Sequence, residues 1–208
     1  MNEISTARPA VFIDRDGTLI EEVNFLSRVN DLRVFPFTAE ALELFKKTGF
    51  LVIVITNQSG IGRRIFDEAA VHEIHGEIER LLPGAVDAFF FCPHLPDEGC
   101  RCRKPKLGLI EDACERFDID LSRSWFIGDK KIDIETGRNA RLKTAMVLTG
   151  YGADHSKQLS QKPDIIAANL LKAAQAIAGT AGVSPAKEPR RRDACGPGDT
   201  APYIDDEA

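Results

Sequence analysis

The chain has 208 residues, of which 43% are hydrophobic and 28% are charged, a composition typical of a globular protein with one sizeable core. Its formal net charge of −5 argues against a general polyanion binder, because non-specific affinity for nucleic acid depends on basic surface. No apolar run is long enough to cross a membrane, and the opening segment, MNEISTARPA, has no basic and apolar signal-peptide regions. We therefore expect a cytoplasmic protein without nucleic-acid or membrane partners.

Five short apolar runs recur along the chain. They are AVFI (10–13), LVIVI (51–55), AFFF (88–91), SWFIG (124–128) and TAMVL (144–148). Continuous runs of Val, Ile and Phe, in place of an alternation between apolar and polar residues, favour strands of a parallel sheet that is covered on both faces.

The segments between these runs have helical patterns. Thr38 is placed to cap a helix that continues to Lys47 and ends at Gly49. Three further helices are expected over 67–82 (apolar face Val71, Ile74, Ile78 and Leu81), near 107–117 (Ile110, Ala113, Cys114 and Phe117 buried) and near 164–178. Strand and helix alternate throughout, which predicts a doubly wound α/β fold with a mostly parallel sheet.

The regular pattern stops near Gly179. Residues 179–208 are rich in Gly, Pro and charge, so we expect one domain over 1–178 and a disordered tail over 179–208. Arg190, Arg191 and Arg192 lie in this tail, and their composition favours solvated charge over a docking patch.

Polar residues follow the ends of three predicted strands. Asp14 and Asp16 come after the first run, Thr56 after the second and Asp129 after the fourth. Open α/β sheets bind ligands at the carboxyl ends of their strands, so these side chains should meet at one edge. Clustered acids are tolerable if a divalent cation lies between them, and a few oxygen ligands completed by water suit Mg²⁺.

A magnesium ion beside a free carboxylate indicates phosphoryl transfer. Aspartate forms covalent phospho-intermediates, and the metal neutralises charge on the transferred group. Such a site also needs a hydroxyl group and a cation for the phosphoryl oxygens, for which Thr56 and Lys104 are the candidates. An isolated Asp-x-Asp or Lys-Pro carries little meaning, so the prediction depends on the ordered set at successive strand ends.

The motifs DRDGT, TNQSG, a Lys-Pro pair and GDKKID resemble those of the haloacid dehalogenase superfamily of aspartate-nucleophile phosphatases, over residues 9 to about 152. The resemblance implies that Asp14 is the nucleophile. It implies that Asp16 is the general acid and base, which protonates the leaving oxygen and then activates the water that cleaves the aspartyl-phosphate. The gaps between the motifs leave no room for a lid domain.

The same resemblance assigns the remaining members of the site. Thr56 and Lys104 would stabilise the phosphoryl group. Asp129 would bind magnesium together with the Asp14 side chain and the Asp16 carbonyl group. Asp133, four residues after Asp129, is expected to support this set without joining it.

The segment CPHLPDEGCRCRK has the composition of a metal site. Two pairs, each with one intervening residue, supply three thiolates and an imidazole from Cys92, His94, Cys100 and Cys102. This is a complete structural zinc set with no open position. We therefore predict a structural zinc loop that leads directly into Arg103 and Lys104. Of the other cysteines, Cys114 is assigned to an apolar helix face and Cys195 to the tail.

Within the superfamily, the zinc loop, DRDGT and TNQSG are similar to two families, the phosphatases of heptose bisphosphate and those of histidinol phosphate. TNQSGIG, the Lys in GDK and VLTGYG favour the first. It implies a phosphorylated sugar substrate contacted by Glu22, Val23, Asn24, Phe25, Thr56, Asn57, Gln58, Ser59, Arg103, Lys104 and Lys130. Near this expected pocket the chain has Asn24-Phe25 where that family usually has Gly-Tyr, and Arg63-Arg64 where it usually has Arg-Gly.

Two other interpretations remain open at this point. A non-catalytic, zinc-stabilised binding module would be supported by Arg101, Arg103 and Lys104, although the acidic net charge and the intact acids argue against it. His72 and His75 are spaced on one predicted helix, and we expect them on a solvated face, not in a metal pair. A monomer is expected.

Overall fold

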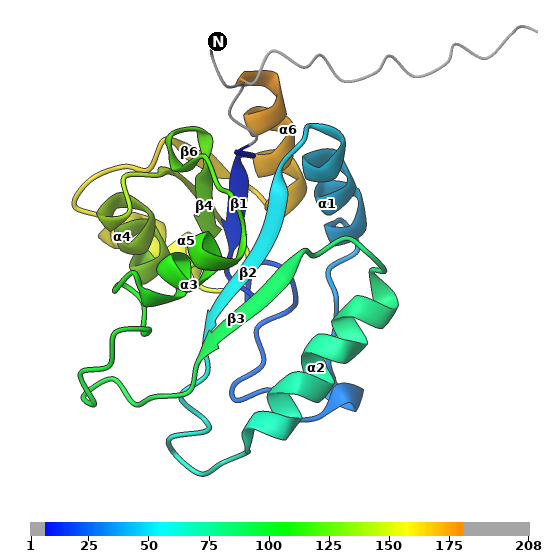
Figure 1. Cartoon of the computed structure of the whole chain (residues 1–208), viewed down its shortest axis with the longest axis vertical. Helices are drawn as coiled ribbons and strands as arrows, with labels where there is room; N and C mark the ends of the chain where they lie inside the picture. The colour runs from blue at the N-terminus through cyan, green and yellow to red at the C-terminus, as the bar shows by residue number, and fades with distance from the viewer. Residues whose placement is uncertain (1–6, 181–208) are drawn as a thin grey trace, which may run out of the picture.

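The computed structural model describes residues 7–180 (Figure 1). Six parallel strands form one sheet in the order β3-β2-β1-β4-β5-β6. The strands are β1 (Ala10–Ile13), β2 (Leu51–Asn57), β3 (Ala88–Cys92), β4 (Trp125–Gly128), β5 (Lys143–Val147) and β6 (Ile165–Ala167). All five predicted strands are confirmed, and the parallel sheet explains their continuous apolar runs.

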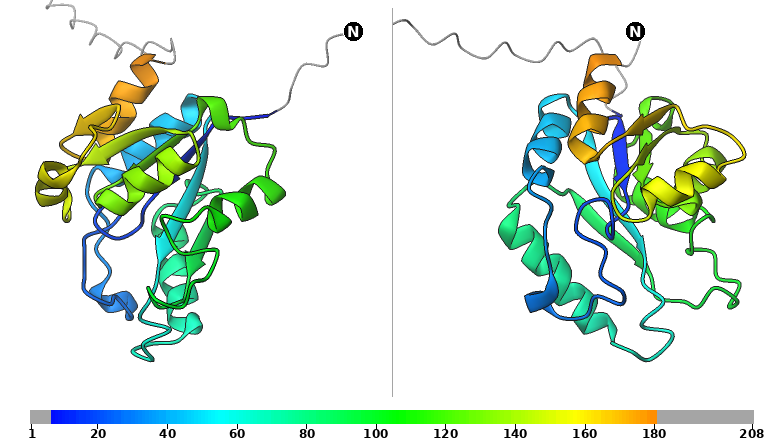
Figure 2. Two further views of the ribbon diagram at one scale, coloured as in Figure 1. Left: turned by 90° about the vertical axis from the view of Figure 1, so that its left-hand side faces the viewer. Right: turned by 180° about the vertical axis from the view of Figure 1, so that it is seen from behind.

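Helices cover both faces of the sheet (Figures 1 and 2). The helices are α1 (Thr38–Lys47), α2 (Glu68–Leu81), α3 (Gly108–Arg116), α4 (Lys131–Asn139), α5 (Gly152–His155) and α6 (Leu170–Thr180). Along β1, Val11 and Ile13 pack in the layer of α1, α2 and α6, whereas Ala10 and Phe12 pack in the layer of α3. The predicted doubly wound fold is therefore confirmed.

The expected helix near 164–178 is wrong at its start. Residues 165–167 form the edge strand β6, and Asn169 begins α6 by accepting a hydrogen bond from the Lys172 amide at 3.0 Å. The helix continues to Thr180, two residues beyond the predicted domain boundary. The predicted tail from 181 onward, including Arg190 to Arg192 and Cys195, lies outside the described residues.

Three helical details also differ from expectation. Thr38 is the first residue of α1, and its hydroxyl group donates to the Leu19 carbonyl oxygen at 2.8 Å instead of capping the helix. Leu81 ends α2 with 44% of its surface exposed, and the next residue, Leu82, is buried in its place. Cys114 is only partly buried.

The candidate site lies between β1 and β4, where the order of the strands in the sheet changes direction. The chain passes from β1 to β2 on one side and from β4 to β5 on the other, so the carboxyl ends of β1 and β4 border a crevice. Among residues 7–180 no inserted domain covers this edge, as the motif spacing predicts. None of the helices in this range is long and apolar enough to span a membrane.

Candidate active site

Asp14 follows β1 and lies against a buried cation. Its backbone amide donates to the Ile127 carbonyl oxygen of β4 at 2.9 Å, which fixes the turn at the sheet edge. Lys104 Nζ donates to Asp14 Oδ1 at 2.8 Å and to Asp133 Oδ1 at 2.6 Å. Burial disfavours the charged amine, but the two carboxylates raise the pKa of Lys104. The residue expected to be the nucleophile and the cation expected to bind the phosphoryl group are therefore adjacent.

Asp14, Asp129 and Asp133 form a buried acidic cluster whose ligand atoms lie within 4.8 Å of one another. Burial and the Asp14 carboxylate raise the pKa of Asp129 to about 8 and that of Asp133 to about 6. Asp129 Oδ2 accepts a hydrogen bond from the Tyr151 amide at 2.8 Å, whereas Oδ1 is buried and has no hydrogen-bond partner among the described residues. An unpartnered carboxylate oxygen among acids fits a divalent cation.

Asp133 differs from its neighbours because both of its oxygens are occupied. Oδ1 accepts from Lys104, and Oδ2 accepts from the Lys130 amide at 3.0 Å, where it caps the start of α4. This arrangement suits the supporting role expected for Asp133.

Two glycines make space for the Asp129 carboxylate. A Cβ atom at Gly17 would lie 2.3 Å from Asp129 Oδ2, and one at Gly150 would lie 2.2 Å from the same oxygen. Both have positive φ, +85° and +53°, so glycine is required on steric and conformational grounds. The sequence reasoning missed these residues as members of the site, although the glycine after Asp16 and the Gly in VLTGYG were available signals.

The Asp16 carboxylate is not part of the acidic cluster and has its own hydrogen-bond donors. Gln58 Nε2 donates to its Oδ2 at 2.9 Å, and the Thr56 hydroxyl group donates to the same oxygen at 3.3 Å. Arg15 donates to both oxygens, from Nε to Oδ2 and from Nη2 to Oδ1, each at 3.1 Å. Burial opposes the charge, yet Arg15 lowers the pKa of Asp16. Its side chain is therefore separate from the candidate metal ligands.

Two adjoining hollows open beside these residues. The first, of about 180 Å³, is lined by Asp14, Asp16, Thr56, Asn57, Arg103, Lys104, Lys130 and Ile132. The second, of about 90 Å³, shares Asp16 and Asn57 and adds Arg15, Val23, Asn24, Phe25, Leu26, Gln58, Ser59 and Gly60. Every predicted substrate-binding residue except Glu22 lines one of them. A larger hollow of about 520 Å³ lies between α1 and the end of α2, away from the acids, so size alone does not locate the site.

Glu22 lines neither hollow, but it forms an ion pair with Lys130, which lines the first. Its Oε2 accepts from Lys130 Nζ at 2.7 Å, which places the Lys130 ammonium at the first hollow and 5.2 Å from the Tyr151 ring centroid. Burial raises the pKa of the Glu22 carboxyl group. The ion pair joins the loop after DRDGT to the loop after β4.

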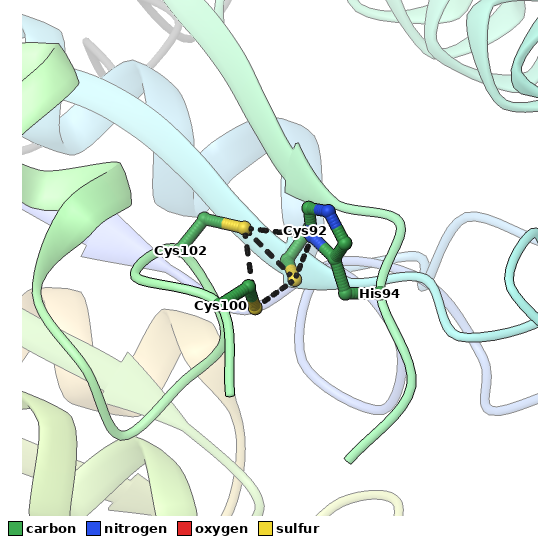
Figure 3. A group of neighbouring side chains, drawn as sticks. All are labelled: Cys92, His94, Cys100 and Cys102. Carbon is green, nitrogen blue, oxygen red and sulfur yellow. Dashed lines mark hydrogen bonds between the residues drawn. The ribbon is translucent and has the colours of Figure 1, made fainter. Parts of the chain in front are cut away.

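The four metal-type residues of the loop after β3 converge (Figure 3; the green loop below and to the left of β3 in Figure 1). The Sγ atoms of Cys92, Cys100 and Cys102 lie 3.1–3.6 Å apart, and His94 Nδ1 is 3.2 Å from Cys102 Sγ. Zinc–sulfur bonds of about 2.3 Å in a tetrahedron require sulfurs about 3.8 Å apart, close to these values. Donor type and spacing therefore fit zinc.

This loop is bonded to the motif after β2. The Gln58 backbone amide donates to the Cys92 carbonyl oxygen at 2.7 Å, and the Lys104 backbone amide donates to Asn57 Oδ1 at 3.1 Å. Arg103 Nη1 donates to the His94 carbonyl oxygen at 3.2 Å. The loop therefore helps to orient both cations that follow it.

The two departures from the usual family pattern contact each other through Phe25, which lines the second hollow, and Arg63. Phe25 and Arg64 have φ of +56° and +59°, and the Arg63 guanidinium lies 6.0 Å from the centroid of the Phe25 ring. A left-handed backbone at residue 64 explains why glycine suits that position.

The expectation for the two helix histidines is right for His72 and wrong for His75. His72 is exposed, but His75 is buried, stacks on Phe89 with ring centroids 4.5 Å apart, and lies 3.3 Å from Arg15 Nη1. Position 75 falls four residues after Val71 and three before Ile78, so the helix period turns it toward the buried stripe.

Comparison with known proteins gives consistent matches. A family model described as HAD-hydrolase-like matches residues 101–173. The D-glycero-D-manno-heptose-1,7-bisphosphate 7-phosphatase of Thermosynechococcus vestitus is 38% identical over 187 residues, covering 82% of this chain and 95% of that protein. The D-glycero-beta-D-manno-heptose-1,7-bisphosphate 7-phosphatase of Pseudomonas aeruginosa is 35% identical over 150 residues, covering 70% and 84%. The crystal structure of D,D-heptose 1,7-bisphosphate phosphatase from B. bronchiseptica, complexed with magnesium and phosphate, matches with a TM-score of 0.77 and 30% identity, covering 83% and 99%.

Proposed function

This chain belongs to the haloacid dehalogenase-like phosphatases, and we propose that it removes the 7-phosphate of D-glycero-D-manno-heptose 1,7-bisphosphate in a magnesium-dependent reaction. It is a phosphoric monoester hydrolase, so the alternative of a non-catalytic binding module is set aside. The observation that carries the proposal is the 2.8 Å contact between Asp14 and Lys104 in a hollow bordered by two further cations.

The chemistry begins at Asp14. One of its carboxylate oxygens attacks phosphorus and forms an aspartyl-phosphate as the bond from phosphorus to the sugar oxygen breaks. Arg15 lowers the pKa of Asp16 in the free protein, so Asp16 takes up a proton from the substrate's phosphate monoanion and passes it to the leaving sugar oxygen. Lys104 and the Thr56 hydroxyl group donate to the phosphoryl oxygens and stabilise the charge that spreads over them. Asp16, now a carboxylate, removes a proton from the water that hydrolyses the aspartyl-phosphate.

Magnesium would be held by Asp14, Asp129 and the Asp16 carbonyl group, and when bound it would neutralise the phosphoryl oxygens. The unpartnered Asp129 Oδ1 supports this assignment. Zinc in the four-residue loop would be structural, because three thiolates and an imidazole leave no open position. A cytoplasmic location is part of the proposal, since a reducing compartment keeps these thiols available for metal.

A bisphosphate suits the cations of the hollow. In this proposal Lys104 binds the reacting phosphate, and Arg103 and Lys130, which line the same hollow, bind the second phosphate. Histidinol phosphate carries an amine, which these two side chains would repel. A charge-assisted contact contributes about 1.5–3 kcal/mol, or about ten- to a hundredfold in specificity. We therefore favour the sugar bisphosphate over histidinol phosphate.

Phosphate release from a substrate panel tests both parts of the proposal. The panel contains both anomers of the heptose bisphosphate, histidinol phosphate and fructose bisphosphate. Asp14→Asn keeps the size of the side chain but cannot attack phosphorus, so kcat should fall at least about a thousandfold. A variant with a tenth of wild-type activity in saturating magnesium would refute the covalent mechanism.

The substrate assignment has its own variant. Arg103→Ala should lower kcat/KM for the heptose bisphosphate about tenfold or more and affect a small monophosphate less. Arg101→Ala is the matched control, because Arg101 lies in the same loop but pairs with Glu111 and Asp112 on α3. Efficient turnover of histidinol phosphate with the sugar bisphosphate untouched would reverse the substrate assignment and leave the mechanism intact.

A further inference from the structure

Arg15, the residue between the two acids of DRDGT, is enclosed by the site. It has the largest of the fully buried side chains, with 1% of its surface exposed. Its Nε and Nη2 groups hold the Asp16 carboxylate, and its Nη1 lies 3.3 Å from His75 Nε2. The guanidinium therefore bridges the carboxylate to a histidine on α2.

We propose that His75 is a positioning residue for the acid–base carboxylate, because it accepts a hydrogen bond from Arg15 and so fixes the guanidinium that holds Asp16. The inference rests on the acid–base role proposed for Asp16. His75 lines neither hollow of the site, so it acts through Arg15 and not on the substrate.

The protonation state of His75 follows from its partner. A guanidinium has five donors and no acceptor, so His75 Nε2 must accept and the ring proton lies on Nδ1. Burial and the charge of Arg15 lower the pKa of His75 to about 3, with a smaller opposing effect from Asp16. The imidazole is therefore a neutral acceptor throughout the physiological range.

The orientation of the imidazole is also fixed. Its ring stacks on Phe89 of β3 with an interplanar angle of 19° and meets the Phe91 ring edge-on, with centroids 6.0 Å apart. Two elements therefore define the acceptor direction, α2 through the backbone and β3 through the rings. A planar guanidinium that donates at both ends cannot rotate without losing one of its partners.

This constraint matters for proton transfer. Asp16 must present one oxygen to the leaving sugar oxygen, and small misplacements of a catalytic group are costly. Without the His75 acceptor, a buried Arg15 donor is unsatisfied, and the guanidinium is free to seek another partner at the expense of Asp16.

The test compares two leaving groups. The sugar alkoxide needs a proton from Asp16, whereas p-nitrophenolate leaves without one. We compare kcat/KM, which reports only the steps up to phosphoryl transfer, for the heptose bisphosphate and for p-nitrophenyl phosphate. The variants are His75→Leu, which fills the space without an acceptor, and His75→Gln, whose amide oxygen reaches Arg15. His72→Leu, one turn earlier on the exposed face of α2, is the matched control.

His75→Leu should lower kcat/KM about tenfold for the sugar substrate and less than about twofold for the aryl phosphate, with KM for the sugar unchanged. His75→Gln and His72→Leu should stay within about twofold of wild type on both. Equal losses on the two substrates, or no loss on either, would overturn the inference. If His75→Leu does not fold, His75→Asn replaces it, because its shorter amide cannot reach Arg15, and the same contrast with His75→Gln decides.

Asp16→Asn separates this inference from the proposed function. It should show a larger loss on the sugar than on the aryl phosphate. If Asp16→Asn discriminates and His75→Leu does not, His75 has no positioning role and the mechanism stands. If Asp16→Asn affects both substrates equally, the acid role proposed for Asp16 is wrong, and the inference fails with it.

Discussion

Asp129→Asn should stabilise the magnesium-free protein at high pH while it abolishes activity. Burial and the Asp14 carboxylate raise the pKa of Asp129 from 3.8 to about 8. Between these values the folded state binds a proton that the unfolded state has released, so the stability of the magnesium-free protein falls as pH rises from about 4 to about 8. Asparagine removes this loss, because it carries no charge at any pH.

The size of the effect can be bounded. At about 1.4 kcal/mol per pH unit, ionising Asp129 in the folded protein costs at most about 6 kcal/mol. Relaxation and water entry reduce such costs, so we expect a gain of about 2 kcal/mol for the variant near pH 8.5 and almost none near pH 4.5. The asparagine oxygen can still accept from the Tyr151 amide, and its NH₂ group can face Asp14.

Urea unfolding measures this difference. Magnesium is removed by dialysis without a chelator, so that zinc remains in its loop. Asp154→Asn, an exposed acid on α5, is the matched control and should change the free energy of unfolding by less than about 0.5 kcal/mol. In saturating magnesium the order should reverse, because only the wild type gains binding energy from this ligand. A variant less stable than wild type at pH 8.5 without magnesium would refute the reasoning.

Three further substitutions probe other parts of the structure. Gly17→Ala puts a Cβ atom 2.3 Å from Asp129 Oδ2, so kcat for phosphate release should fall about a hundredfold, and retention of half the activity would contradict this. Cys100→Ser should lower both the zinc content measured by metal analysis and the thermal midpoint, since structural zinc contributes on the order of 10 kcal/mol in small peptides; an unchanged midpoint after zinc loss would show that the loop does not need metal. Arg64→Gly relieves a φ of +59° and should raise the urea unfolding free energy by up to about 1 kcal/mol, whereas a loss of that size would be inconsistent with backbone strain.

The positions of the candidate catalytic residues could be predicted because these residues lie at strand ends. Asp14, Thr56 and Asp129 each follow an apolar run, and parallel strands deliver their carboxyl ends to one edge whatever the details of packing. The candidate metal cluster of three cysteines and a histidine could also be predicted, because its four residues lie within eleven positions and need no tertiary information. Local spacing and sheet topology are sufficient for both.

The remaining features depend on tertiary contacts that have no local signal. Gly150 belongs to the site only because β5 brings it against Asp129, and His75 only because α2 packs beside β3. Three-residue strands such as β6 are too short for periodicity to distinguish from the start of a helix. The sequence does not show which element, distant along the chain, packs against each of these residues.

The charges of the site balance in a way that supports the proposed metal. The three acids of the cluster and the single ammonium of Lys104 leave two negative charges when all are ionised, which one divalent cation would neutralise. Asp16 is already matched by Arg15 and therefore does not compete for the metal with its side chain.

Two further cations, Lys130 and Arg103, line the hollow and are not paired with the acidic cluster. Lys130 is paired with Glu22, but that pair is partly exposed and lies at the hollow, where a phosphate can take over part of the interaction. The Arg103 guanidinium forms no ion pair within residues 7–180 and donates to the His94 carbonyl oxygen, so its charge is available to an incoming anion. If magnesium binds the acidic cluster as proposed, the Cys/His loop would have a specific part in recognition, because it holds the Arg103 guanidinium beside the hollow without an acidic partner among residues 7–180. A substrate with a second phosphate would use that charge, and a monophosphate amine would not.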